Sequence, residues 1–514
     1  MPAEVSRRRH GRQVRGQRAD DSVVYDAWRS SLRPVAYVVV GLAIAMLSCL
    51  TVATSATDAV PVAASAIITL CAAGVVWWFS LPADVFGRRE ATLAVALIWL
   101  CTGVFGGLPL VIGADLPPAD AFFEAVSGFT TTGATVITAI EATVSRPLML
   151  WRSLMQWLGG MGVVVLFVAV FPSVGAGGKH LFRGEVPGPS AEGLVPRIRS
   201  TSRVLWEIYA ALTVAEVAAL WLAGMGLFDA VCHSMTTLST GGFSTHDASA
   251  AAFHSPLIEV ILSVFMLLSG MNFSLYYGAL VQGSWRVFAR STEFRAYLAI
   301  IVGSTALLTL LIRSLHPTYG VALQKAFFMV ATLLTSTGYG NGEDYMAYPG
   351  GGVALLLIIM FLGGMAGSTA GGIKTARVVV LLKLAWSQTR ATIRPSVVQV
   401  VRMDGKPVPV AVLSEVGAFL VVFMVTLAAS TLTISIIEGE AAEKTFGAVL
   451  SCLSNMGPAP YHLLNADHYA DYSAISKILF GLVMILGRLE FFTLLALMLP
   501  DFWSGFRRSR RGGS

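Results

Sequence analysis

The chain has 514 residues, of which 55% are hydrophobic and only 13% are charged, and its mean hydropathy is +0.70. A soluble protein of this length needs far more charge to cover its surface, so this composition excludes a soluble globular protein. The formal net charge of +6 requires no nucleic-acid partner, because its distribution along the chain follows membrane topology.

Basic residues dominate the N-terminus, which begins MPAEVSRRRHGRQVRGQR. No short apolar core with a cleavage site follows closely, so we predict a retained cytoplasmic tail over residues 1–34 and not a signal peptide. Residues 35–82 then hold two apolar segments, each long enough to cross a hydrocarbon layer of about 30 Å as a helix. Further such segments include Ala91–Ile112, Leu205–Leu227 and Val408–Ile437, which indicates a polytopic membrane protein.

Connections rich in Lys and Arg alternate along the chain with connections that are poor in both residues. The basic residues cluster at Arg88 and Arg89, from Lys179 to Arg199, from Arg286 to Arg295, from Arg390 to Lys406, and in the C-terminal FRRSRRGGS. The intervening connections are poorer in both residues. By the positive-inside rule the basic connections and both termini are cytoplasmic, so the number of crossings is even, and we count ten.

The chain after the two leading spans repeats one plan four times: a span, a short amphipathic helix, a polar turn and a second span. The turns are EAVSGFTTTGATV, SMTTLSTGGFSTHD, LLTSTGYGNG and LSCLSNMGPAPYH, with central glycines Gly133, Gly241, Gly338 and Gly457. Their recurrence roughly every hundred residues indicates internal repetition. We predict pore repeats over residues 83–180, 181–290, 291–400 and 401–505, then a basic cytoplasmic tail over residues 506–514.

Polar, glycine-rich turns between membrane spans need a physical reason. Irregular backbone at membrane depth is tolerated only where it lines water or is packed within protein. Four turns that face the same way can surround one axis, where their carbonyl oxygens replace the hydration shell of a cation. Glycine reaches the required backbone conformations at little cost, and each short helix points its negative end toward the ion. One isolated cluster is usually a plain turn, but four equivalent copies favour a pore.

Six stretches in order resemble the superfamily of Trk, Ktr and HKT cation transporters, most closely the bacterial Trk-type membrane subunit. They are EAVSGFTTTGATV, WRSLMQWLGGMG, LFRGEVPGP, TTLSTGGFSTHDAS, GGMAGSTAGGIKTAR and LGRLEFFTLL, and TSTGYG also resembles the potassium-channel filter signature. The resemblance extends from about Ala91 to Trp503. It implies an all-α fold with four pseudo-symmetric helix–pore loop–helix repeats around one central pore, besides two extra N-terminal transmembrane helices.

The same resemblance implies potassium uptake across the cell membrane, with K⁺ as the transported ion and no covalently bound cofactor. It places the selectivity filter at Thr131, Thr132, Gly133, Ala134, Ser239, Thr240, Gly241, Gly242, Ser336, Thr337, Gly338, Tyr339, Asn455, Met456, Gly457 and Pro458. In this family a central glycine in all four loops goes with potassium selectivity, whereas serine in the first goes with sodium transport. The innermost position is polar in every loop, as Thr131, Ser239, Ser336 and Asn455.

A glycine-rich segment, Phe361–Arg377, interrupts the second span of the third repeat. Its glycines are Gly363, Gly364, Gly367, Gly371 and Gly372. Each costs a helix about 1 kcal/mol relative to alanine, so an unwound intramembrane loop is expected below the filter. A nucleotide-binding P-loop is not expected, because Ile373 intervenes before Lys374 and no buried strand precedes the segment. The resemblance implies that this loop is a gate.

Arg488 lies in a long apolar segment, where a charge is costly and normally faces a cavity or a partner. It either extends toward the cytoplasmic interface or projects into the pore beneath the filter, the role that the resemblance implies. Glu490 is two positions further on and would face elsewhere on a helix. Lys374 could reinforce a barrier formed by Arg488.

Several acidic residues leave alternatives open. Asp120, Glu124 and Asp344 are expected near the outer mouth, where they would raise the local cation concentration. Alternatively, Asp120 and Glu124 simply favour the starts of short helices. The acids within spans, Glu216, Glu259 and Glu415, are expected to be interhelical or near-interface groups.

The resemblance also implies a homodimer in the membrane lipid and a peripheral cytosolic regulatory subunit that binds nucleotides. The basic cytoplasmic connections are candidate docking surfaces for that subunit. A sodium-permeable or proton-coupled symporter of the same superfamily and an alternating-access carrier remain alternatives. A membrane-embedded enzyme is not expected, because the sequence has no catalytic triad, paired carboxylates or His/Cys metal-ligand motif.

Overall fold

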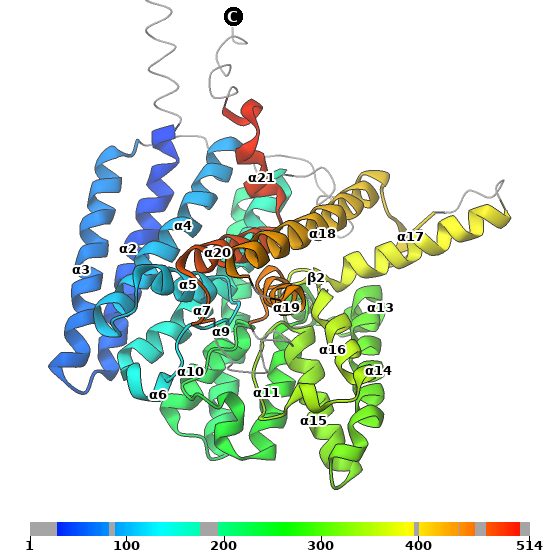
Figure 1. Cartoon of the computed structure of the whole chain (residues 1–514). Coiled ribbons are helices and arrows are strands. Elements are labelled where there is room, and N and C mark those ends of the chain that lie inside the picture. The colour runs from blue at the N-terminus through cyan, green and yellow to red at the C-terminus, as the bar shows by residue number, and fades with distance from the viewer. Residues whose placement is uncertain are drawn as a thin grey trace, which may run out of the picture.

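The computed structural model describes residues 28–81, 88–174, 194–394, 400–439, 441–457 and 469–503. Four predictions lie wholly or largely outside these ranges: the two basic tails, the stretch LFRGEVPGP and the filter residue Pro458. Within the described ranges nearly all of the regular secondary structure is helical (Figure 1). Its strands are two residues long each and form two separate pairs.

The two leading spans form a helical hairpin at one edge of the molecule (Figure 1). They are α2 (Leu32–Ser48), which continues as a 3-10 turn to Val52, and α3 (Ala56–Phe79). The hydroxyl of Ser55 begins α3 by accepting the amide hydrogen of Asp58 at 3.2 Å, as an N-cap residue does. Large apolar side chains such as Trp78 point outward, as expected of a surface that faces lipid.

The first two repeats follow the predicted plan of span, pore helix, loop and span. The first consists of α4 (Arg88–Gly113), α5 (Pro118–Phe129), α6 (Ile140–Thr143) and α7 (Arg146–Val174). The second consists of α9 (Leu194–Leu222), α10 (Leu227–Leu238), η3 (Ser249–Phe253), α11 (Pro256–Ser269), α12 (Phe273–Tyr276), η4 (Tyr277–Val281) and α13 (Arg286–Arg290).

The last two repeats follow the same plan with more interruptions. The third consists of α14 (Thr292–Ile312), η5 (Arg313–Leu315), α15 (Tyr319–Leu334), η6 (Tyr345–Ala347), α16 (Gly350–Phe361), β1 (Leu362–Gly363), β2 (Ile373–Lys374) and α17 (Thr375–Ile393). The fourth consists of β3 (Arg402–Met403), β4 (Lys406–Pro407), α18 (Val410–Glu438), α19 (Ala442–Leu453), α20 (Ala474–Arg488) and α21 (Phe492–Met498). In Figure 1, α17 runs away from the body at the side opposite α3.

Judged by helix length and apolar composition, the described residues hold fewer candidate membrane spans than the ten predicted. Six helices of the described residues are long and apolar enough to cross a membrane, or eight when two bent helix pairs each count as one span. Two predicted crossings have no counterpart among these candidates. One corresponds to α7, and the other corresponds to α16 and α17 taken together. The second of these falls short because α16 has only 12 residues before the glycine-rich loop interrupts the span.

The second spans differ in how they are broken. We predicted a break in the third repeat only, but α11 and the following α12–η4 segment meet at 89°, and α20 and α21 meet at 117°. The bend after α20 is made by Glu490 and Phe491, which have positive φ angles of 54° and 62°. The bend after α11 accommodates the glycine-rich loop, because the amide of Met365 donates to the carbonyl of Gly270 at 2.8 Å.

Candidate functional site

Four loops at the ends of the pore helices α5, α10, α15 and α19 share one backbone conformation. The C-cap residue that follows each pore helix carries a hydroxyl, and the next residue has a φ between 52° and 56°. We number that left-handed residue position 1, so that a glycine with positive φ occupies position 3. In all four loops the amide of position 2 donates to the carbonyl five residues earlier, at 2.8–2.9 Å. The internal repetition is therefore confirmed at atomic detail.

This shared geometry corrects the alignment of the second loop by one residue. Position 1 is Thr131, Thr240, Ser336 and Asn455, and position 3 is Gly133, Gly242, Gly338 and Gly457. The sequence prediction placed Gly241 and Ser239 at these positions, but Ser239 ends the pore helix, as Thr130 does in the first loop. Two adjacent glycines made both alignments possible, and the backbone angles and the hydrogen bond from the Gly241 amide to the carbonyl of Thr236 distinguish them.

The four loops converge on one another at position 2. A Cβ atom added to Gly133 would overlap the carbonyl oxygen of Gly241 and lie 3.6 Å from that of Thr337. A Cβ atom on Gly242 would overlap the carbonyl oxygen of Thr337, and one on Gly457 would lie 2.7 Å from that of Thr132. The positive φ angle therefore favours glycine at position 3 of all four loops, and the neighbouring carbonyl groups also require it in the first, second and fourth loops. The carbonyl oxygens of the first three loops thus lie close together at position 2.

Hydroxyl groups fix the first and third loops in similar ways. The hydroxyl of Ser127 donates to the carbonyl of Ala134 at 2.6 Å, and that of Thr332 donates to the carbonyl of Tyr339 at 3.2 Å. Each donor lies seven residues before its acceptor. These bonds hold the carbonyl at position 4 of each loop against its own pore helix. Serine and threonine within the apolar pore helices therefore have a structural role that hydropathy alone does not reveal.

The second and fourth loops are held instead by neighbouring elements. Gln156 of α7 donates from Nε2 to the carbonyl of Gly241 at 2.8 Å and accepts the amide of Phe243 at 3.1 Å. Asn455 donates from Nδ2 to the hydroxyl of Thr132 at 3.0 Å and to the carbonyl of Met484 at 3.0 Å. Gln156 was missed by the sequence prediction, although a buried amide side chain in an otherwise apolar span was a usable signal.

Of the two acidic residues that were expected at the outer mouth or at a helix start, Glu124 was placed incorrectly and Asp120 was not. Glu124 lies at neither the outer mouth nor a helix start: it is fully buried in the middle of α5 and pairs with Arg152 of α7 at 2.7 Å. Its position on the inner face of an amphipathic helix is the reason. Asp120 lies in the first turn of α5, as one alternative predicted, and pairs with Lys477 at 2.8 Å. Asp344 is exposed in the connection after the third loop.

The three acidic residues within spans lie in three different environments. Glu259 of α11 pairs with Lys325 of α15 at 2.9 Å, which confirms that it is interhelical. Lys325 also donates to the carbonyl of Asn341, just beyond the third loop, at 3.2 Å. Glu415 is exposed on α18. Glu216 is fully buried in α9, and its carboxyl oxygens have no hydrogen-bond partner among the residues that the structure describes.

The glycine-rich segment is an unwound loop, as predicted, and it lies against the chain at the C-terminal ends of the pore helices α10, α15 and α19. Its ends pair as parallel strands β1 and β2. The amide of Gly371 donates to the hydroxyl of Ser336 at 2.6 Å. The hydroxyl of Thr369 contacts the carbonyls of Leu238 at 3.1 Å and Ser269 at 3.2 Å. A Cβ atom on Gly371 would overlap the carbonyl of Ser454, so glycine permits this close approach.

Arg488 points at this loop and does not extend to an interface. Its side chain is 5% exposed, and Nη1 donates to the carbonyl of Thr369 at 2.7 Å. Its Nε and Nη2 atoms have no hydrogen-bond partner among the described residues. Lys374 donates to the carbonyl of Ala370 within the same loop. Glu490 faces elsewhere, as expected, and pairs with Arg377 at 2.5 Å.

A further residue fixes this loop and was not predicted. Glu293, in the first turn of α14, accepts the amide hydrogen of Ala366 at 2.6 Å and that of Ala376 at 3.1 Å. One carboxylate therefore joins the middle of the loop to the start of α17. The sequence signal was an acidic residue at the start of a span, which we did not connect with the loop because about seventy residues separate them.

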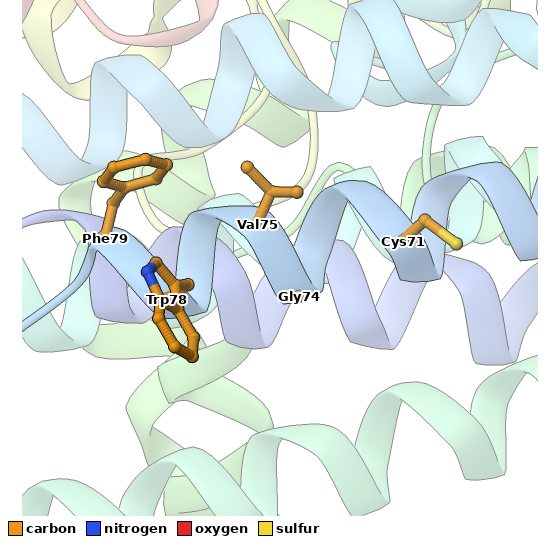
Figure 2. Close-up of a pocket in the computed structure, with 5 residues that line it drawn as sticks. All are labelled: Cys71, Gly74, Val75, Trp78 and Phe79. Atoms are coloured by element: carbon orange, nitrogen blue, oxygen red, sulfur yellow. The ribbon is translucent and has the colours of Figure 1, made fainter.

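The pocket in Figure 2 is not part of this site. Cys71, Gly74, Val75, Trp78 and Phe79 line it, and all five belong to α3 in the leading hairpin (Figure 2). Its lining is almost wholly apolar and its side chains are largely exposed. Among the described residues, no group of three or more His, Cys, Asp or Glu side chains is arranged to hold a metal ion.

The chain matches a known family of membrane proteins over nearly its whole length. The family model of the TrkH cation transport proteins matches residues 59–503, which include all four repeats. The chain belongs to the TrkH family. It is therefore a multi-pass membrane transporter and not an enzyme, as the sequence predicted.

Characterised members of the TrkH family match nearly the whole chain. The Trk system potassium uptake protein TrkH of Salmonella typhimurium is 36% identical over 85% of this chain and 90% of that protein. The TrkH protein of Halomonas elongata is 39% identical over 81% of this chain and 86% of its own length. The crystal structure of the potassium transporter TrkH from Vibrio parahaemolyticus matches with a TM-score of 0.84 and 32% identity, covering 92% of this chain and 99% of that one.

Proposed function

We propose that this protein takes up potassium ions across the cell membrane through a selectivity filter made by its four loops. The observation that carries the proposal is the convergence of the position-2 carbonyl groups of Thr132, Gly241 and Thr337, with glycine at position 3 of every loop. Carbonyl oxygens around one axis replace the hydration shell of a cation. The family members described above are named potassium uptake proteins and a potassium transporter, which supports the choice of ion.

Transport would follow the electrochemical gradient. A negative-inside membrane potential contributes about 2.3 kcal/mol per elementary charge for each 100 mV, which favours cation entry. No side chain with a full charge contributes to positions 1 to 3 of any loop, so the ion is held by dipoles alone. Dipoles bind a dehydrated cation without trapping it, which is what rapid permeation needs.

The glycine-rich loop and Arg488 form the gate in this proposal. The loop reaches filter residue Ser336 and the carbonyl of Ser454 from the inner side, and Arg488 adds a positive charge beneath them. A positive charge in a narrow passage of low dielectric repels a cation strongly. Movement of the loop and Arg488 away from the filter would open the path.

The partners and the orientation belong to the same proposal. We expect a homodimer and a peripheral nucleotide-binding subunit on the cytosolic side, with both termini in the cytosol. Exposed basic residues near the cytoplasmic end of the third repeat, such as Arg390 and Arg394, offer a surface for an acidic partner. Mass measurement of the detergent-solubilised protein tests the dimer, and co-purification from the native membrane tests the regulatory subunit.

Ion flux into proteoliposomes tests the proposed function. Rubidium, as a potassium analogue, and sodium fluxes are measured with and without a pH gradient. Preferred rubidium entry that follows the membrane potential and ignores the pH gradient supports the proposal. Sodium entry at an equal rate, or flux that requires the pH gradient, identifies the sodium-permeable or proton-coupled alternative.

A substitution in the third loop ties this function to the filter. Gly338 has a φ of 83°, so Gly338→Ser should abolish rubidium preference and potassium-dependent growth of an uptake-deficient strain. Gly303→Ser in α14 is the matched control, because a Cβ atom there would meet nothing within 4 Å. Unchanged ion preference in Gly338→Ser would overturn the assignment of the filter.

A further inference from the structure

The four loops differ at position 4, just after the filter glycine. Tyr339 of the third loop has a hydroxyl that donates to the carbonyl of His233 at 3.0 Å and contacts the hydroxyl of Thr236 at 2.5 Å. Both partners belong to α10, so Tyr339 fastens its loop to a neighbouring pore helix. The corresponding residues of the first and second loops, Ala134 and Phe243, have no group that could donate such a bond.

The first loop is fastened instead by a buried ion pair. Arg152 of α7 donates to Oε1 of Glu124 from Nε at 3.0 Å and from Nη2 at 2.7 Å. Glu124 in turn accepts the amide of Val136 at 3.0 Å and the hydroxyl of Thr135 at 3.0 Å. Thr135 and Val136 directly follow position 4, so the carboxylate holds the outer part of the first loop.

The same guanidinium also reaches the second loop. Nη1 of Arg152 donates to the carbonyl of Ser244 at 3.2 Å, and the guanidinium carbon lies 4.1 Å from the centre of the Phe243 ring. Phe243 occupies position 4, where the third loop has Tyr339. A cation over an aromatic face is attracted by the negative charge of that face, most strongly where water is excluded. One side chain therefore contacts two adjacent loops.

The geometry of this contact is rigid for three reasons. Arg152 and Glu124 are 1% and 0% exposed, so neither can exchange its partner for water. A planar guanidinium has donors in fixed directions, which an ammonium group lacks. α7 itself is continuous through both Arg152 and Gln156, and Gln156 binds the second loop again at Gly241.

We propose that Arg152 and Glu124 are specificity-determining residues that set the spacing between the first and second filter loops. The inference rests on the proposed function, because it concerns the selectivity of the proposed filter. In it, this ion pair fastens the first and second loops as Tyr339 fastens the third loop to α10. Both are positioning residues, since they reach the ion only through the loops. Discrimination between K⁺ and the smaller Na⁺ depends on how firmly the carbonyl ring keeps its size and geometry.

The experiment compares rubidium and sodium flux through Arg152→Lys, Glu124→Gln and wild-type protein in the same proteoliposomes. Arg152→Lys keeps the charge but cannot bind Glu124 and Ser244 together, so the rubidium-to-sodium ratio should fall about tenfold, as the loss of one charge-assisted hydrogen bond predicts. Glu124→Gln leaves the Arg152 charge unpaired and should lower the ratio further. Total cation flux persists in both variants.

A matched control separates selectivity from stability. Lys477→Gln breaks another largely buried ion pair, with Asp120, on the far end of α5 from the filter loop. It should lower the melting temperature without changing the rubidium-to-sodium ratio. Wild-type ratios in folded Arg152→Lys and Glu124→Gln would overturn the inference. A wild-type protein without rubidium preference would instead overturn the proposed function. If Lys477→Gln lost as much selectivity as the two variants, the loss would reflect a general decrease in the stability of the protein, and this result would also overturn the inference.

Discussion

The second spans of the first and third repeats occupy corresponding places but are built in opposite ways. α7 is continuous, and its side chains Arg152 and Gln156 reach out to bind the first and second loops. The span of the third repeat is divided by the glycine-rich loop, whose backbone itself lies against the loops. A regular helix satisfies its own backbone hydrogen bonds, whereas the amides of the glycine-rich loop depend on separate side chains such as Ser336 and Glu293. In the proposed function, α7 is therefore the fixed support of the filter and the glycine-rich loop is the movable element beneath it.

The largest expected effect is on the supported side. Gly242→Ala should abolish uptake, because its Cβ atom would overlap the carbonyl of Thr337 and its φ is 75°. Gly241→Ala should only reduce uptake, because the new methyl group meets the side chain of Gln156 and not backbone. Rubidium uptake by an uptake-deficient strain measures both. A more severe defect in Gly241→Ala would show that the structural alignment of this loop is wrong.

Arg488→Ala tests the movable side. Removal of the Arg488 guanidinium, which contacts the glycine-rich loop, should raise basal rubidium flux through the purified protein by about tenfold, since an unscreened charge in a narrow low-dielectric passage repels a cation strongly. Lys383→Gln on α17 is the control, because its ammonium lies away from the loop and donates to the carbonyl of Arg402. Equal flux in Arg488→Ala and wild type would contradict a gate at this residue.

Glu293→Ala should loosen the same loop less strongly. The amides of Ala366 and Ala376 would both lose their acceptor, at a cost of about 1–3 kcal/mol for each buried donor left unpaired. Basal flux should rise by a smaller factor than in Arg488→Ala. Glu293→Gln keeps an acceptor oxygen and should stay near wild type. If the glutamine variant leaks as much as the alanine variant, the charge and not the hydrogen bonding is what matters.

The smallest effect on stability is expected for an exposed contact between the first two repeats, which joins Glu141 and His246. Glu141 accepts a hydrogen bond from His246 at 2.9 Å, and this bond holds the pKa of the exposed carboxyl below its ordinary value of 4.5. Because this pKa is lowered by folding, the ionised Glu141 carboxylate contributes to the free energy of unfolding above pH 4.5. This contribution is lost as the pH falls through the pKa of Glu141 in the folded protein. Glu141→Gln should therefore lower the melting temperature slightly at pH 7, and not at all at a pH below the folded-state pKa. An equal deficit at both pH values would contradict this account.

Much of the fold followed from the sequence because the constraint of the membrane is severe. Apolar length predicted the spans, and the four polar turns predicted the loops, since glycine and hydroxyl residues are otherwise rare between spans. The glycine-rich loop was visible for the same reason. The register of the second loop was not, because Gly241 and Gly242 differ in backbone angle and not in residue type.

The supports of the filter were less predictable from sequence. Glu124 and Arg152 are 28 residues apart and belong to different helices, so only the packed structure joins them. On a hydropathy scale each residue only lowers the apolar character of its segment. The rule that acidic residues favour helix starts placed Glu124 incorrectly. Breaks after α11 and α20 were missed as well, since they depend on residues such as Glu490 and Phe491 that adopt positive φ without being glycine.

The central claim is that carbonyl oxygens of four loops surround one dehydrated potassium ion. A diffraction or cryo-EM map of the protein loaded with rubidium or thallium locates the heavy cation directly. We predict density on the axis between the carbonyls of Thr132, Gly241 and Thr337, at position 2 of the loops. A heavy-cation peak elsewhere in the membrane region, with this position empty at saturating concentration, would contradict the account.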